Sequence, residues 1–212
     1  MKKNAIIKTL DYLENVLDTQ EDHDAIAQLR ESVDLLEEVD TGVSSDPSGF
    51  SVPMEAVGAY TVYSDGGCRG NPGPGAWGAM GQRPDGVVFF ESSGFEFQTT
   101  NNRMELTGAI ESLKALANEL EEEDLDLSHA AFLYSDSKYV VDGISKWVPG
   151  WKSRGWKKAD KKTPENIELW QSFDEIAGKF SNLQFRWVKG HSGHPQNEHC
   201  DLLANKAMDE NI

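Results

Sequence analysis

The sequence predicts a mixed α/β fold, an open sheet with helices on both faces, preceded by a short helical extension. The strand-like segments come first in hairpin order and then alternate with helical segments, which favours a sheet that mixes antiparallel and parallel strands. The length of 212 residues suits one good-sized domain with an appendage. The net charge of −16 opposes general binding to polyanions, so nucleic-acid binding requires a local basic patch.

Each element of the sheet domain has its own signal. Alternating aromatic and β-branched residues predict a first strand at 59–64. Two more strands at 76–81 and 87–97 are joined by the turn Pro-Asp-Gly at 84–86, which predicts a hairpin. Pro164 suits the first turn of a helix. The periodicity beyond residue 100 predicts, in order, helix 102–120, strand 130–135, helix 137–146, helix 163–178, strand 183–188 and helix 197–208.

The N-terminal segment differs in amino-acid composition from the rest of the chain. Residues 1–50 hold 12 acids and 4 bases, a net charge of −8. Two apolar stripes at helical spacing predict an acidic helical hairpin over residues 1–39. Residues 40–56 are rich in Gly, Ser and Pro and are expected to be a flexible linker, and residues 57–212 form the main domain. Three roles for the hairpin stay open: protein interaction or self-association, folding back on the main domain, or a loosely ordered solubilising tail.

The cellular compartment is indicated by features that the sequence lacks. Cys68 and Cys200 are the two cysteines, too few for a disulfide scaffold. No apolar run approaches 18 residues, and acids interrupt the apolar stretch near the N-terminus, so neither a membrane span nor a signal peptide is predicted. We expect a cytoplasmic protein.

Four acids fall where predicted strands end or helices begin: Asp65, Glu105, Asp136 and Asp201. Sites in open α/β sheets form at the carboxyl ends of the parallel strands, so neighbouring first and fourth strands would place Asp65 beside Asp136. Clustered carboxylates repel one another unless a cation neutralises them, and oxygen ligands in an incomplete cage suit Mg²⁺ or Mn²⁺. Among 36 acids, however, spacing alone is a weak signal.

Five sequence blocks provide the stronger signal: YSDGGCRGNPGPGAWGAM, TTNNRMEL, YSDSKYVVDGI, WKSRGWKKADKK and WVKGHSGHPQNEHCDLLA. In this order, over residues 58–208, the chain resembles bacterial type 1 ribonuclease H. The resemblance implies a five-stranded mixed sheet and an endonuclease that cuts the RNA strand of RNA/DNA hybrids with two Mg²⁺ ions, leaving 3′-hydroxyl and 5′-phosphate ends. Mn²⁺ is a possible substitute.

The resemblance also assigns roles to particular residues. It makes Asp65, Glu105, Asp136 and Asp201 the catalytic carboxylates and metal ligands. It makes His191 a catalytic histidine that assists turnover, because an imidazole is suited to proton transfer near neutral pH. Residues expected to contact the hybrid are Cys68, Asn71, Asn101, Asn102 and Lys138, and Asn amides can bond to minor-groove edges and 2′-hydroxyls.

A basic segment stands out against the acidic background. Residues 152–162 hold six bases and one acid, a net charge of +5, and tryptophans interleave with them. In the resembled family this is a protrusion that holds the DNA strand, and its lysines would give salt-dependent phosphate affinity. The residues expected to take part are Trp147, Trp151, Lys152, Arg154, Trp156, Lys157, Lys158, Lys161 and Lys162.

Two rival interpretations are weaker. A zinc site built from His191, His194, His199 and Cys200 has the wrong spacing for a standard finger and lacks a second cysteine pair. His194 and His199 are better explained as structural or surface residues. A non-catalytic hybrid-binding or protein-interaction module is the alternative function, but a pure binder would have no need to crowd four acids beside a phosphate backbone.

Overall fold

The chain divides into two compact units, Met1–Ser44 and Ser45–Ile212. The structure, a computed structural model, describes residues 10, 14, 23, 25–27, 29–30 and 50–212. No helix in this described part combines the length and the apolar character needed to cross a membrane.

The described residues of the first unit are helical. Leu10 and Ile26 are buried, and Arg30 Nη2 donates a hydrogen bond to Glu14 Oε2 at 2.7 Å. The remainder of the hairpin predicted for residues 1–39, and residues 40–49 of the expected linker, lie outside the described residues.

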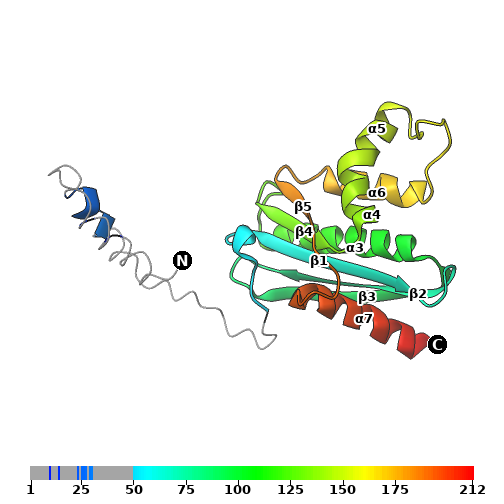
Figure 1. Ribbon diagram of the computed structural model, residues 1–212, viewed down its shortest axis with the longest axis horizontal. Coiled ribbons are helices and arrows are strands. Elements are labelled where there is room, and N and C mark those ends of the chain that lie inside the picture. The colour runs from blue at the N-terminus through cyan, green and yellow to red at the C-terminus, as the bar shows by residue number, and fades with distance from the viewer. Residues whose placement is uncertain (1–9, 11–13, 15–22, 24, 28, 31–49) are drawn as a thin grey trace. The chain divides into compact units, whose positions relative to one another are not determined.

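The second unit is built on a five-stranded mixed sheet, which confirms the predicted fold class (Figure 1). The strand order is β3-β2-β1-β4-β5. The β1–β2 and β2–β3 pairs are antiparallel, whereas β1–β4 and β4–β5 are parallel. The strands are β1 (Tyr60–Cys68), β2 (Gly73–Gln82), β3 (Val88–Thr99), β4 (Ala131–Ser135) and β5 (Leu183–Trp187).

Helices cover both faces of this sheet, as the sequence predicts. Helix α7 packs against β1, β2 and β3, and the helices α3 to α6 lie on the opposite side (Figure 1). The helices are η1 (Met54–Ala56), α3 (Asn101–Glu122), α4 (Lys138–Asp142), the π-helix η2 (Gly143–Trp147), α5 (Val148–Ser153), α6 (Ile167–Ala177) and α7 (Pro195–Asn211).

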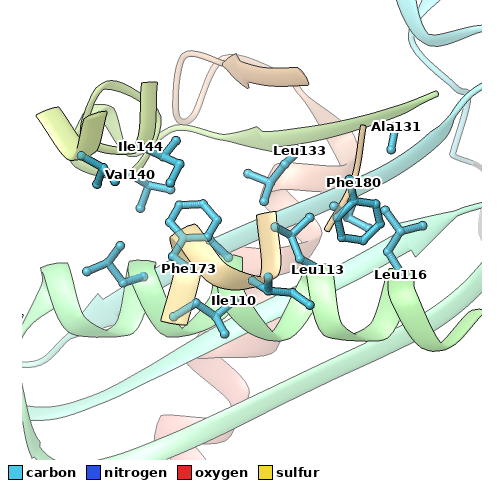
Figure 2. Close-up of a cluster of buried hydrophobic side chains, with 14 of the residues drawn as sticks. Ile110, Leu113, Leu116, Ala131, Leu133, Val140, Ile144, Phe173 and Phe180 are labelled. Carbon is cyan, nitrogen blue, oxygen red and sulfur yellow. The ribbon is translucent and has the colours of Figure 1, made fainter. Parts of the chain in front are cut away.

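The alternation of side chains along the strands builds two cores. Val62 and Leu133 face the main core with Leu113 of α3 and Phe173 of α6, and Figure 2 shows this cluster. The next residues along β1 and β4 point to the other face and pack with Cys200 of α7. Because successive strand side chains point to opposite faces, two short apolar strands suffice to line both cores.

Most element boundaries differ from the sequence expectations by a few residues, and three of the differences have a clear physical cause. Strand β1 continues past residue 64 to Cys68, because its antiparallel partner β2 extends alongside it. The helix expected at 137–146 continues to Ser153 through a π-helical turn, and Pro149 falls in the first turn of α5, where a missing N–H costs little. Helix α6 begins at Ile167 rather than 163, so Pro164 precedes the helix instead of opening it.

The end of the expected linker packs on the second unit. Residues 50–56, called here the strap, include the turn η1, in which Ala56 is fully buried. Phe50 and Val52 pack against the core on the α7 side of the sheet. Residues 50–56 therefore belong structurally to the sheet domain.

Candidate active site

The register of β1 and β4 brings the first two acids together. The parallel pairing ends at Tyr63 opposite Tyr134. Asp65 and Asp136 each lie two residues further along the chain, so they emerge side by side at the carboxyl ends of adjacent parallel strands. Asp65 lies within β1 rather than at its end, because β1 continues in the antiparallel pairing with β2.

Glu105 reaches the same place from the first turns of α3. A side chain at Gly66 would meet the backbone of this helix, since a Cβ there would lie 2.4 Å from Glu105 N. Glycine at this position therefore allows α3 to approach β1 directly beside Asp65. Ser137, immediately after Asp136, donates a hydrogen bond through its hydroxyl to Glu105 Oε2.

Asp201 is supplied by α7 on the other face of the sheet. Gly78 pairs with Asp65 across β1 and β2, and a Cβ at Gly78 would lie 2.1 Å from Cys200 O. The close helix crossing that glycine permits carries Asp201 to the edge of the acid cluster. Asn205, one turn later, donates to Asp201 Oδ1 at 2.8 Å.

The electrostatics show that the four acids act on one another. Burial raises the pKa of Asp65 to about 7, and repulsion from Asp136, Asp201 and Glu105 contributes. Burial also raises the pKa of Glu105 to about 7, with repulsion from Asp136, although the Ser137 hydrogen bond acts in the opposite direction. Two carboxyls that would otherwise ionise near pH 4 are thus held protonated to near neutrality without a cation.

This donor set suits a hard divalent cation. All four side chains offer carboxylate oxygens. Burial is the main cause of the raised pKa values of Asp65 and Glu105 and mutual repulsion adds to it, and a bound cation would offset both effects. Within the described residues, no group of three or more His, Cys, Asp or Glu side chains is arranged to hold a metal ion by itself. An open set of carboxylates fits Mg²⁺, which keeps several waters and takes further oxygens from substrate phosphates.

His191 lies on the exposed loop between β5 and α7, with a left-handed backbone at φ 50°. The loop borders the acid cluster, because a Cβ at Gly190 would lie 2.3 Å from Asp136 Oδ2. The Gly193 N–H donates to Glu198 Oε1 at 2.9 Å, which ties the loop to the first turns of α7. His194, which precedes α7, packs against Tyr63 and Tyr134 instead of facing the loop, as expected for a structural residue.

Four of the residues expected to contact the hybrid gather at one end of the sheet. Cys68 ends β1, and its thiol donates to Gly70 O at 2.5 Å. Asn71 lies in the β1–β2 loop, while Asn101 and Asn102 begin α3 directly after β3. The pairing of Gly73 with Thr99 brings the loop and the start of α3 together. Asn71 and Asn101 are exposed and Asn102 is partly exposed.

The basic protrusion comprises α5 and the loop up to α6. Its tryptophans mainly pack: the rings of Trp147 and Trp151 lie 6.0 Å apart, both contact the buried Trp170, and Trp156 packs against the main core. Trp147 keeps 38% of its surface exposed. The aromatic cluster thus anchors the protrusion to α6.

The basic side chains of the protrusion are exposed, except that of Lys158. Lys152 Nζ pairs with Asp174 of α6 at 2.7 Å, Lys157 Nζ donates to Thr163, and Lys158 is partly buried beside the tryptophans. Arg154, Lys161 and Lys162 are exposed, as Lys152 and Lys157 are; Arg154 Nε donates to Lys157 O at 3.2 Å, and Lys162 Nζ pairs with Asp160 at 3.6 Å. The exposed side chains present positive charge to solvent.

Sequence reasoning missed two residues of the site. Ser137 both bonds Glu105 and caps α4, accepting from Val140 N at 3.3 Å. Trp187, 45% exposed at the end of β5, donates to Asp136 O at 2.9 Å, and the ammonium of Lys138 lies 4.7 Å from its ring centre. Ser137 could have been predicted as a helix N-cap, because serine is common at that position, whereas no sequence pattern predicts the contact between Trp187 and Asp136.

Comparison with known proteins identifies the family. A sequence model of the ribonuclease H family, described as RNase H, matches residues 58–209. The protein named Ribonuclease H in Rhizobium meliloti is 51% identical over 148 residues, covering 70% of this chain and 89% of that protein. Ribonuclease H of Cupriavidus necator is 48% identical over 149 residues, covering 70% and 94%.

Solved structures give the same result for the fold. LC9-RNase H1, a type 1 RNase H, is 32% identical with a TM-score of 0.61, covering 77% of this chain and 76% of that one. LC11-RNase H1, solved in complex with RNA/DNA hybrid, is 27% identical with a TM-score of 0.56, covering 72% and 98%. With its five-stranded sheet and a family match over residues 58–209, this chain belongs to the ribonuclease H family of enzymes and groups with the type 1 members.

Proposed function

We propose that this chain is an endonuclease that hydrolyses the RNA strand of RNA/DNA hybrids, leaving 3′-hydroxyl and 5′-phosphate ends. The observation that carries the proposal is the electrostatically coupled acid cluster, in which Asp65 and Glu105 have pKa values of about 7. A binding protein would gain nothing from such charge beside a phosphate backbone. The hybrid in the LC11-RNase H1 complex supports the choice of substrate.

The proposed cofactor is a pair of Mg²⁺ ions, with Mn²⁺ as a substitute, held by Asp65, Glu105, Asp136 and Asp201. When bound, two such ions would activate a water and stabilise the leaving oxygen of the phosphodiester. Ser137 orients Glu105, and Asn205 orients Asp201, so each acid presents a fixed oxygen. His191, on its exposed loop, is suited to carry a proton to or from the departing product.

Hybrid binding is assigned to two surfaces. Cys68, Asn71, Asn101 and Asn102 are proposed to contact the minor groove, where 2′-hydroxyls distinguish RNA from DNA. Lys138 and the protrusion are proposed to bind phosphates, with Trp147 as the exposed ring and with these exposed charges: Lys152, Arg154, Lys157, Lys161 and Lys162. Trp151, Trp156 and Lys158 act there mainly by fixing the shape of the protrusion.

The test is cleavage of end-labelled RNA in a hybrid, with and without Mg²⁺, beside single-stranded RNA and an RNA duplex. Metal-dependent internal cuts confined to the hybrid are expected, and Asp65→Asn should abolish them. Asp124→Asn, the same chemical change beyond the far end of α3, is the matched control and should cut normally. Tight hybrid binding without cleavage in either Mg²⁺ or Mn²⁺ would contradict the proposal and favour the binding module.

For the N-terminal unit we propose self-association or a protein partner through residues 1–39. Its net acidity disfavours nucleic acid, and Leu29, 53% exposed, offers an apolar side chain for contact with another protein. Sedimentation of the full chain and of a chain beginning at Ser45, which keeps the strap, is the test for self-association. A monomeric mass for both chains would contradict self-association, and a cell-lysate comparison of the two chains would then test for a partner.

A further inference from the structure

The strap, residues 50–56, lies before the region that the family sequence model matches, which begins at residue 58. Its contacts with the sheet domain are specific. The strap residues Ser51 and Phe50 each accept a side-chain hydrogen bond through a backbone carbonyl, and Glu55 accepts one through its carboxylate. These contacts connect the strap to the sheet and to the start of α7.

The first contact is a buried amide relay to the start of α7. Gln196, in the first turn of α7, donates through Nε2 to Ser51 O at 2.7 Å and to Gln82 Oε1 at 3.0 Å. Gln82 in turn donates to Gly86 O at 2.8 Å and lies 3.3 Å from Phe50 O. Gln196 is only 2% exposed and Gln82 is fully buried, so loss of one partner leaves buried polar groups unpaired.

The second contact involves the residue that precedes α7. Tyr134 OH donates to Glu55 Oε1 at 3.1 Å, and the Tyr134 ring stacks on Tyr63 with ring centres 5.0 Å apart. His194 packs against both tyrosine rings, at 5.8 and 5.6 Å. Glu55 thereby fixes the aromatic surface on which His194 rests.

The third contact lies one turn further along α7. The Phe50 ring meets the His199 ring edge-on with centres 5.1 Å apart. The strap therefore touches α7 directly at Gln196 and His199 and indirectly at His194, all ahead of Asp201.

The first turns of α7 also hold the loop of His191, because Glu198 accepts from the Gly193 N–H at 2.9 Å. We infer that the strap is a positioning device for the reaction, in which Glu55 and the Ser51 carbonyl set α7 so that Asp201 and the His191 loop are correctly placed. The inference rests on the proposed nuclease function, and Glu55 and Gln196 act through other residues without touching substrate.

The activity test measures kcat and KM for a labelled hybrid with the full-length variants Glu55→Ala and Gln196→Ala, below their unfolding temperatures. We expect kcat to fall about ten-fold with KM nearly unchanged, because ångström-scale misplacement of a catalytic group can cost about 100-fold in rate. Glu55→Gln, which keeps an acceptor for Tyr134 OH, should recover most of the rate. Met54→Ala is the matched control, since that side chain is 84% exposed in the same turn.

A second measurement is independent of activity. Amide hydrogen exchange should accelerate at residues 190–201 in Glu55→Ala and Gln196→Ala, and should stay unchanged along α3. If the parent chain cuts no hybrid, the proposed function fails, and the exchange result still tests the contacts. If the parent cuts and Glu55→Ala matches it in kcat, or if Glu55→Gln is as slow as Glu55→Ala, the positioning role is wrong.

Discussion

The Ser137 hydroxyl donates to Glu105 Oε2 while it accepts from the backbone N–H of Val140. A single side chain thus caps α4 and fixes a carboxylate supplied by α3. The link joins the end of β4, which carries Asp136, to the helix that supplies Glu105. Ser137 therefore fixes Glu105 relative to Asp136, the residue that it follows in the chain.

Replacing Ser137 by Ala should remove both the cap of α4 and the hydrogen bond to Glu105. Loss of the cap should cost about 1 kcal/mol in the free energy of unfolding. Loss of the hydrogen bond should raise the pKa of Glu105 further, because that bond lowers it, and should reduce kcat about ten-fold. Urea unfolding and steady-state kinetics measure the two effects. Ser137→Thr, which retains a hydroxyl, is the control, and equal loss in both variants would argue against the hydrogen bond.

The stability of the metal-free protein should depend on pH through Asp65 and Glu105. Their pKa values in the folded state, about 7, lie above the ordinary 3.8 and 4.5, so the folded state binds more protons between these limits. Stability should therefore be greatest below about pH 4 as far as these groups contribute, and should fall as pH rises to 7, by on the order of 7 kcal/mol for the two shifts together.

Thermal unfolding of Asp65→Asn and of the parent chain, in a chelator and in Mg²⁺, checks this dependence. The variant should be the more stable of the two at pH 8 without metal, and Mg²⁺ should stabilise the parent selectively. If neither Asp65→Asn nor added Mg²⁺ alters the unfolding temperature at pH 8, the acids are not coupled as described.

Gly190 should tolerate no side chain without loss of activity. A Cβ there would lie 2.3 Å from Asp136 Oδ2, so Gly190→Ala must displace either the carboxylate or the His191 loop. We expect kcat to fall at least about 100-fold with a modest change in unfolding temperature, because the loop is exposed. Gly67→Ala is the control, since its nearest neighbour is the end of the Met208 side chain at 3.7 Å. Normal activity in Gly190→Ala would contradict the stated geometry.

The exposed bases of the protrusion should set the salt dependence of hybrid binding. Replacing Lys161 and Lys162 together by Ala should weaken binding at low salt and reduce the slope of log K against log salt by about 1 to 2. Lys206→Ala on α7 removes one positive charge outside the protrusion and should leave the slope nearly unchanged. Titrations by fluorescence anisotropy at several salt concentrations, without Mg²⁺, give the slopes. An unaltered slope in the double variant would contradict a role for the protrusion in hybrid binding.

Much of the fold was accessible from the sequence because its elements have clear periodicity. The alternation around Val62 and the helical spacing along α3 predicted the right elements within a few residues. The start of α6 was misplaced because Pro164 is compatible with a helix start, whereas the left-handed backbone of Asn166 places the start at Ile167, four residues later than predicted. The length of β1 was underestimated because its last residues, Gly66 to Cys68, have low strand propensity and are held by pairing with β2.

The sequence by itself determined the family, the identity of the four acids and the sign of the charge on the protrusion, since these depend on residue types and their order. Only the tertiary structure decided what holds those residues in place. The Ser137 and Trp187 contacts with the site, the inward packing of the protrusion tryptophans and the joining of residues 50–56 to α7 all connect positions far apart in the chain. Such contacts follow from the sheet register and helix crossings, which no local pattern encodes.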